Sequence, residues 1–295
     1  MNGAAERVRR AITGAEDLKS VVRSMKAVAA SSIAQYEQSV QALEDYYRTV
    51  ELGLVACFRQ TAEIPLLLDG AHRGTGTIGA VIFGSDQGLV GRFNEVLLEF
   101  AARNLGVLPG KVTHVWALGE RIQALTEEAS LPAAVLLPVP GSVNAITRIV
   151  GRILIEIETI RERVGLEHCY LFHHRPKSGA TYEPVSQQLL PLDDAWRRKL
   201  STAKWPTKAA PEVLGGVSVA LRSFIQGYLF VLLFRACAES LASENASRLA
   251  AMQRADKSIE ESLKDLNQTY HRLRQDSIDE ELFDVVSGYE ALSKG

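Results

Sequence analysis

The sequence predicts a mixed fold, in which two long terminal helices form an antiparallel coiled coil flanking a small α/β domain. The first observation behind this prediction is where the prolines lie. All ten fall between Pro65 and Pro211, which leaves 64 residues in front and 84 behind without one. Because proline costs a helix interior about 3 kcal/mol, such gaps favour uninterrupted helices. The expected segments are residues 1–64, 65–211 and 212–295.

The second observation is a 3-4 spacing of apolar residues in the first segment. It runs from Val8 to Leu54, with one shift near Met25–Ala29–Ile33. A sustained 3.5-residue repeat is typical of a helix supercoiled against another helix, and a shift of this kind resembles a stutter. We therefore expect one helix from Val8 to Arg59, about 78 Å long at 1.5 Å per residue.

The last segment repeats this spacing from Val217 to Leu292 and is longer than the first by about 24 residues, or roughly 36 Å. In an antiparallel pair, residues from about Thr269 onward would have no partner within the chain. This end carries an apolar stripe, here called the apolar tip, formed by Ile278, Leu282, Val285, Tyr289 and Leu292. An exposed apolar stripe is unfavourable in water, which favours entry into a partner's sleeve, with folding back or dimerisation as alternatives.

The third observation is the alternation of strand-like and helix-like segments in the middle of the chain. Such alternation predicts an α/β layer fold, here of Rossmann-like type. A turn is expected at Arg175–Gly179. The expected strands are Thr77–Phe83, Val112–Leu118, His168–His173 and Tyr182–Leu190, and the expected helices are Asn94–Leu105, Glu120–Glu128 and Ser142–Val164.

Composition excludes several classes of protein. The formal net charge is −2, and no basic stripe of the kind that binds nucleic acid is present. Cys57, Cys169 and Cys237 are far apart in sequence, which fits a reducing compartment and argues against a disulfide framework. The apolar run Gly227–Phe234 is shorter than the 20 or so residues that span a bilayer, so we expect a buried helix turn.

Three motifs suggest chemistry but lack the context for it. Gly74–Gly79 fits the dinucleotide pattern GxGxxG, yet it precedes a strand instead of following one. Gly84–Gly91 lies between a strand and a helix with the wrong glycine spacing, so we expect a tight turn that lets a helix pack on the sheet. His168 and His174 would lie about 20 Å apart on one strand, too far for a shared metal. We expect no catalytic, cofactor-binding or metal-binding residues, and no cofactor.

Four segments, in matching order and spacing, resemble the gamma subunit of F-type ATP synthases. They are LKSVVRSMKAVAASS at Leu18–Ser32, GSDQGLVGRFN at Gly84–Asn94, ESLASENASRL at Glu239–Leu249 and RQDSIDEELFDVVSG at Arg274–Gly288. The chain departs from the family pattern at Asp279, where Thr is usual, and at Tyr289, where a small residue is usual. These departures suggest a divergent branch.

The resemblance implies a non-catalytic rotor, the central stalk that couples transmembrane ion flow to ATP synthesis or hydrolysis. The implied partners are the alpha and beta subunits of the catalytic ring, the epsilon subunit and the membrane rotor ring of c subunits. The implied location is peripheral, at the cytoplasmic face of a bacterial plasma membrane. The bearing at the top of the ring would then be the sleeve for the apolar tip.

The same resemblance assigns contact residues by position. Met25 and Lys26 correspond to the part of the family's first helix that faces a beta-subunit lever loop. Arg274, Gln275 and Glu281 correspond to the part of its last helix that meets the catch region of the ring. Arg248 corresponds to a polar position in the family's small-residue stretch. Without the resemblance, each charged residue among these would be interpreted as an ordinary exposed helix charge.

Two other functions remain open from the residues themselves. One is a nucleotide-binding α/β enzyme with helical oligomerisation arms, which would use Gly84–Gly91 and an acidic ribose partner such as Glu120. The other is a coiled-coil tether whose α/β domain binds a membrane protein.

Overall fold

The computed structural model describes most of the chain in two compact units. The first unit contains Met1–Ala29 with Arg248–Gly295, and the second contains Ala30–Ser247. The structure describes residues 2–60, 76–129, 131–132, 134–177, 181–192, 196, 198, 200, 202–203, 205–209 and 211–293, without the side chains of residues 2, 288 and 290–293.

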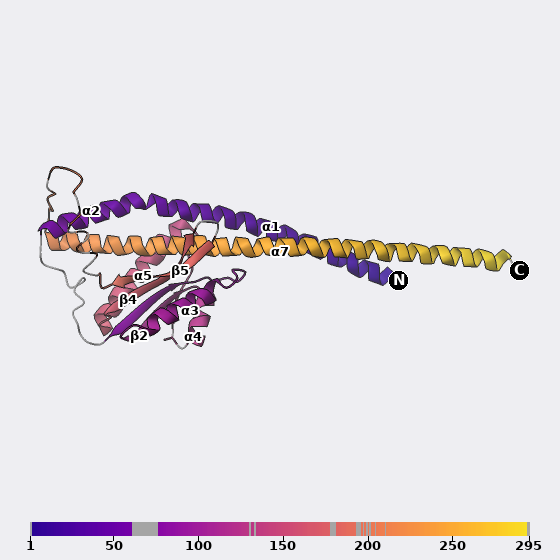
Figure 1. Cartoon of the computed structure of the whole chain (residues 1–295), viewed down its shortest axis with the longest axis horizontal. Coiled ribbons are helices and arrows are strands. Elements are labelled where there is room, and N and C mark those ends of the chain that lie inside the picture. Colours follow the sequence, from indigo (N-terminus) through magenta and orange to yellow (C-terminus); the bar gives the residue numbers. More distant parts are fainter. Residues whose placement is uncertain are drawn as a thin grey trace. The chain divides into compact units, whose positions relative to one another are not determined.

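The terminal segments are helical, as predicted. Helix α7, Val217–Ser293, is one uninterrupted element of 77 residues (Figure 1). The N-terminal segment consists of two helices, α1 (Asn2–Ala42) and α2 (Glu44–Gln60). The prediction of one helix was therefore wrong at Leu43. The amide of Leu43 is shared between the carbonyls of Ser39 at 3.3 Å and Val40 at 3.2 Å, a local tightening of the helix.

In the first unit, the ends of α1 and α7 pair in antiparallel orientation. Lys19 Nζ lies 2.7 Å from Glu260 Oε1, and Lys26 Nζ lies 2.7 Å from Asp256 Oδ2, so residue numbers rise along one helix and fall along the other. The interior side chains follow the predicted 3-4 spacing. They are the buried Val22, Ala29 and Met252 and the half-buried Leu263, Leu266 and Leu273.

The second unit is built on a five-stranded sheet in the order β3-β2-β1-β4-β5. The first four strands of this order are parallel, and β5 is antiparallel to β4. Strand β3 was not predicted, and β4 continues through Lys177, so Arg175–Lys177 belong to a strand and not to the expected turn. The strands are β1 Thr77–Phe83, β2 Lys111–Leu118, β3 Ala134–Leu137, β4 His168–Lys177 and β5 Thr181–Leu190.

Helices cover both faces of this sheet (Figure 1). Helices α3 (Phe93–Gly106) and α4 (Glu120–Glu128) pack on the face that carries Ile78, Ala80 and Ile82. The opposite face, with Trp116, packs against α5 (Val143–Val164), α2 and the part of α7 that belongs to this unit. The alternation of buried side chains along β1 therefore supplies two separate cores, and the α/β domain is Rossmann-like as predicted.

Helix α7 is, by length and composition alone, also apolar enough to cross a membrane. An 18-residue window in it reaches a mean hydropathy of 1.7, and 39% of that window is buried within the described part of the chain. Leu221, Ile225 and Leu233 of this helix are fully buried members of the core that covers the sheet. We interpret the apolar run as a core segment of α7, in agreement with the buried turn predicted for Gly227–Phe234.

Candidate functional site

A buried carboxylate joins α7 to the sheet of the second unit. Glu239 lies on α7 and is 7% exposed. Its Oε2 accepts hydrogen bonds from His173 Nε2 at 3.0 Å and Arg175 Nε at 3.4 Å, both on β4. Its Oε1 accepts a hydrogen bond from Arg235 Nε at 2.8 Å, one helical turn earlier. The carboxylate is therefore satisfied by two elements at once.

The electrostatics of this cluster keep Glu239 ionised. Burial alone raises the pKa of Glu239, but the hydrogen bonds from His173 and Arg235 outweigh burial and lower that pKa to about 2. Burial lowers the pKa of His173, against the opposing effect of Glu239. Near neutral pH, a neutral imidazole thus donates its Nε2–H to a carboxylate whose charge is balanced by Arg235 and Arg175.

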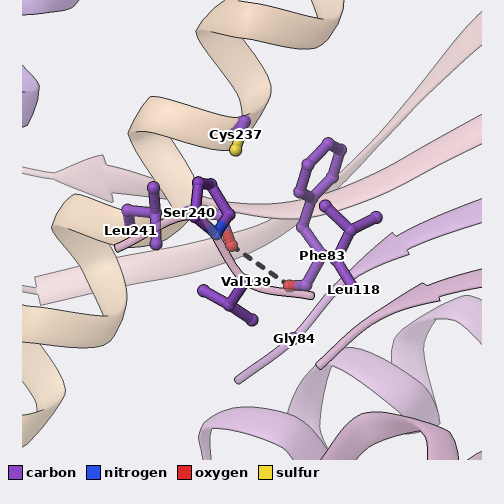
Figure 2. Close-up of a pocket in the computed structure, with 8 residues that line it drawn as sticks. Phe83, Gly84, Leu118, Val139, Cys237, Ser240 and Leu241 are labelled. Atoms are coloured by element: carbon purple, nitrogen blue, oxygen red, sulfur yellow. Dashed lines mark hydrogen bonds between the residues drawn. The ribbon is translucent and has the colours of Figure 1, made fainter. Parts of the chain in front are cut away.

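Three serines continue this contact along the same side of α7. Ser240 Oγ donates to the carbonyl of Phe83 at 3.1 Å, shown by the dashed line in Figure 2. Ser243 Oγ lies 3.3 Å from the carbonyl oxygen of His174 and 2.8 Å from that of Glu239, and Ser247 Oγ donates to the carbonyl of Val90. All three serines are buried. We call Glu239, Ser240, Ser243 and Ser247 together the docking face of α7.

The second partner of the docking face is the turn after β1. Ser85 N donates to Asn94 Oδ1 at 3.0 Å, and Asn94 Nδ2 donates to Ser85 Oγ at 2.8 Å, which closes the turn onto the start of α3. Asp86 accepts the backbone N–H groups of Glu120 at 3.1 Å and of Val139 at 3.3 Å. This confirms the predicted tight turn, whose polar groups are engaged in holding neighbouring segments.

Helix packing explains the first glycine of the same turn. A side chain at Gly84 would overlap Ile122 of α4, which is fully buried against the sheet. Glycine is thus needed here because α4 approaches the backbone closely.

The position at which Rossmann-like sheets usually bind ligands is filled by α7. In such sheets the ligand crevice lies beyond the carboxyl ends of the strands, where the strand order reverses, which here is between β1 and β4. Ser240 meets the carbonyl of Phe83, the last residue of β1, and Ser243 meets that of His174, three residues before the end of β4. A cavity beside Cys237 and Val139, at the ends of β1 and β2, has a volume of about 10 Å³, room for about one water (Figure 2). A nucleotide does not fit there, which argues against the enzyme hypothesis.

The other motifs considered in the sequence also have structural roles. Gly76 N donates to Glu167 Oε2 at 3.0 Å, and Gly79 leaves room for the ring of Trp116, where a Cβ would lie 2.9 Å from the ring. Gly74 lies outside the described residues. His174 is buried between the rings of Phe93 and Tyr182, with ring centroids 4.4 and 4.7 Å away.

Neither metal nor thiol chemistry is evident. Among the described residues no group of three or more His, Cys, Asp or Glu side chains is placed to hold a metal ion. Cys57, Cys169 and Cys237 are buried, and burial raises the pKa of each thiol. Such thiols are poor nucleophiles.

The contact residues expected on the long helices differ in exposure. Met25 and Arg248 are half-buried, and Lys26 is engaged in the ion pair with Asp256. Arg274, Gln275 and Glu281 are exposed on α7. Their assignment to particular partner loops stays a prediction.

The apolar tip is exposed wherever its side chains are described. Ile278 is 46% exposed, Leu282 58%, Val285 70% and Tyr289 74%, while the side chain of Leu292 lies outside the described set. Two further apolar residues, Phe283 and Val286, are also exposed. Half-buried positions continue to Ser277, about two turns beyond the expected Thr269, because α1 already begins at Asn2.

Comparison with known proteins now assigns the family. The family described as ATP synthase matches residues 4–292, nearly the whole chain. Relatives that match over almost their full length are named ATP synthase gamma chain. The chain belongs to the ATP synthase gamma family. It is a non-catalytic stalk subunit of that complex, so the predicted recognition and rotor role are confirmed, and its association with a membrane is through the complex.

The bacterial relatives have low sequence identity to this chain, but they align with it over almost their full length. The gamma chain of Leptothrix cholodnii is 25% identical over 296 residues, covering 98% of this chain and 99% of the relative. That of Frankia casuarinae is 26% identical over 310 residues and covers all of both chains.

Solved structures show the same fold. A rotor chain of the Euglena gracilis mitochondrial ATP synthase aligns with a TM-score of 0.62 at 15% identity, covering 94% of this chain and all of that one. A second chain from this assembly, in another rotational state, aligns with a TM-score of 0.63 at 16% identity, covering 99% and 95%.

The docking face was missed in the sequence, although its segment contributed to the resemblance. Its signal is a set of polar residues at 239, 240, 243 and 247, which share one side of a helix among the small and apolar residues Leu241, Ala242 and Ala246, although Glu244 and Asn245 are polar as well. That pattern indicates a buried polar contact, but it does not identify the partner, because His173 is 66 residues away in sequence.

Proposed function

We propose that this gamma-family chain is the turning shaft of its ATP synthase and that the apolar tip runs in a sleeve formed by the alpha and beta subunits. The observation that carries the proposal is the exposed apolar stripe at the end of an uninterrupted 77-residue helix. Burial of each such side chain would contribute about 1.5–3 kcal/mol. If the stripe stayed in water, this free energy of burial would not be gained. We therefore infer that a partner surface covers the stripe.

The charges beside the stripe indicate what this sleeve is like. Five acidic residues and no basic residue lie between positions 276 and 284, namely Asp276, Asp279, Glu280, Glu281 and Asp284. All five are exposed. The partner surface therefore pairs an apolar lining with positive charge, because a neutral or acidic lining would leave these carboxylates desolvated and unpaired.

The other contacts follow from the family. The related solved structures are rotor, F1/c-ring and central-stalk assemblies of mitochondrial ATP synthases. We infer that the α/β domain of this chain contacts the epsilon subunit and the c-ring, and that the complex lies at the cytoplasmic face of a bacterial plasma membrane. Met25, Arg274, Gln275 and Glu281 are then the long, polar or flexible contacts that a turning surface can exchange between successive partners.

Truncation after Ser277 tests the sleeve. The complex reassembled with the shortened chain should pump fewer ions per ATP hydrolysed, by about two- to threefold, because the apolar anchor of the shaft is lost. The measurement is ion pumping and ATP hydrolysis in proteoliposomes, normalised to the amount of assembled complex. Unchanged pumping per ATP would show that the tip has no mechanical role.

Two full-length variants separate the apolar stripe from the acidic charges. The first replaces Ile278, Leu282, Val285 and Tyr289 by serine, and we expect it to behave like the truncation. The matched control replaces Asp279, Glu280 and Asp284 by their amides and keeps the stripe, and we expect it to lose less coupling than the serine variant because the apolar contact remains. If only this control lost coupling, charge would hold the tip and the apolar sleeve would be refuted.

A further inference from the structure

We propose that the docking face of α7 is the torque-bearing joint between the α/β domain and the long helix. Glu239, Ser240, Ser243 and Ser247 are in this view positioning residues that make the two parts turn together. The inference rests on the proposed shaft function and goes further by stating where in the chain torque passes. All the contacts of the docking face lie within the second unit.

The geometry of the contact is suited to resisting rotation. The hydrophobic effect is non-directional, so apolar burial defines the angle of a helix about its own axis less sharply than hydrogen bonds do. Hydrogen bonds require alignment and weaken steeply when the angle at the hydrogen becomes poor. The docking face adds directional bonds to β4 and to the turn after β1, over about two helical turns.

The chemistry of the contact also makes it hard to break. Ser240, Ser243 and Ser247 are 3%, 1% and 8% exposed. On breaking the contact, the hydroxyls of Ser240 and Ser247 and the carbonyls of Phe83 and Val90 would lose their partners away from bulk water, whereas Ser243 would keep its bond to the carbonyl of Glu239. Leaving such groups unsatisfied costs about 1–3 kcal/mol each. Tyr182 of β5 adds another polar contact, with its hydroxyl 3.0 Å from Ser247 Oγ.

Glu239 is the strongest single element of the joint. Its two oxygens connect Arg235 of α7 with His173 and Arg175 of β4. Turning α7 about its axis would move the carboxylate away from both strand residues and leave an ionised group partly buried without them. An unpaired charge in that position raises the free energy, so the contact resists rotation of α7 relative to the sheet.

The test compares two attachment points for a rotation probe on the same chain. The catalytic ring of the reassembled complex is immobilised, and ATP drives the shaft. In one form the probe is attached to a cysteine at Val107 in the α/β domain, which is 80% exposed, and in the other at Val219 on α7, which is 67% exposed. Torque must pass from α7 through the docking face to reach the probe at Val107. It reaches the probe at Val219 along α7 itself.

Two variants weaken the joint in different ways. Glu239→Gln keeps the size of the side chain and removes its charge, and its matched control is Glu183→Gln, which removes a surface ion pair with Lys177. The triple variant S240A/S243A/S247A removes the hydroxyls. Its control is Ser223→Ala, whose hydroxyl bonds only within α7, to the carbonyl of Val219 at 3.2 Å.

We expect both joint variants to lower the stall torque about twofold at the Val107 probe and to leave it unchanged at the Val219 probe. The control variants should match the parent at both positions. If the joint variants kept the parent's stall torque at both probes, the proposal would be wrong. It would also be wrong if they lost the same torque at both probes. If the parent turns neither probe, the shaft function itself fails, and the joint fails with it.

Discussion

The contacts of Glu239 in the second unit and of Lys19 in the first unit use charged side chains in opposite ways. In the second unit, Glu239 is 8% exposed at its side chain and bonds to two elements. In the first unit, Lys19 and Glu260 form a single contact in which the glutamate is 56% exposed. The same chemistry thus appears once as a buried network and once as a surface pair.

This difference matches what each unit has to do. Surface ion pairs contribute little because water competes for both charges, so they can be exchanged for contacts with a partner at small cost. Buried networks are costly to disrupt and fix one arrangement of the elements they join. The exposed pair between α1 and α7 is therefore the less costly contact to break, and the buried contact between α7 and the sheet is the more costly one.

The largest expected effect comes from removing the buried carboxylate. Glu239→Ala should lower the free energy of unfolding by about 3–5 kcal/mol, because His173 and two arginines lose their common acceptor. Chemical denaturation followed by circular dichroism measures it. The matched variant Glu260→Ala, in the first unit, should change stability far less. Similar losses for both would remove the contrast between the units.

The next effect is a dependence of stability on pH. Burial lowers the pKa of His174 to about 4 from an ordinary value of 6.5, although the carbonyl of Phe93 accepts a hydrogen bond from its Nε2 at 2.9 Å. The unfolded chain therefore binds this proton more readily than the folded chain. The stability that His174 contributes is complete above pH 6.5 and is lost as the pH falls toward 4, by about 2–3 kcal/mol.

His174→Gln tests this directly, because the amide can still donate a hydrogen bond but does not titrate. Its free energy of unfolding should fall less steeply between pH 6.5 and 4 than that of the parent. Some slope should remain, since burial also lowers the pKa of His173. The control is His271→Gln, on the exposed surface of α7. A slope equal to that of the parent in H174Q would mean that His174 is not the titrating group.

How much of the fold and of the site could be predicted from the sequence depends on how far apart in sequence the contacting residues are. Strand β1 and helix α4 have the predicted bounds, because a β-branched run and a glycine turn are local signals. Strand β3 has four residues, and its Val135 and Leu136 are both exposed, so no alternation marks it. It is a strand because β2 offers it an edge.

The functional surfaces divide in the same way. The apolar tip was predictable, since the two proline-free ends differ in length and spacing shows which residues share a side. The residue at which α7 becomes unpaired was not predictable, because it depends on the residue at which α1 begins. The docking face joins α7 to residues 64 to 157 positions away. No local pattern contains that pairing, so only the folded structure reveals it.

The smallest expected effects concern the two ion pairs of the first unit and decide whether Lys26 has a role beyond its pair. Lys19→Gln should lower the free energy of unfolding by about 0.2–1 kcal/mol, and 1 M salt should remove the difference from the parent, because exposed charges are screened. Lys26→Gln should lower stability somewhat more, because its partner Asp256 is 16% exposed whereas Glu260 is 56% exposed. In the reassembled complex the two should differ, with K26Q alone slowing ATP-driven rotation if the corresponding side of α1 meets the ring. If K19Q and K26Q rotated at equal rates, Lys26 would have no role in the ring contact beyond its ion pair with Asp256.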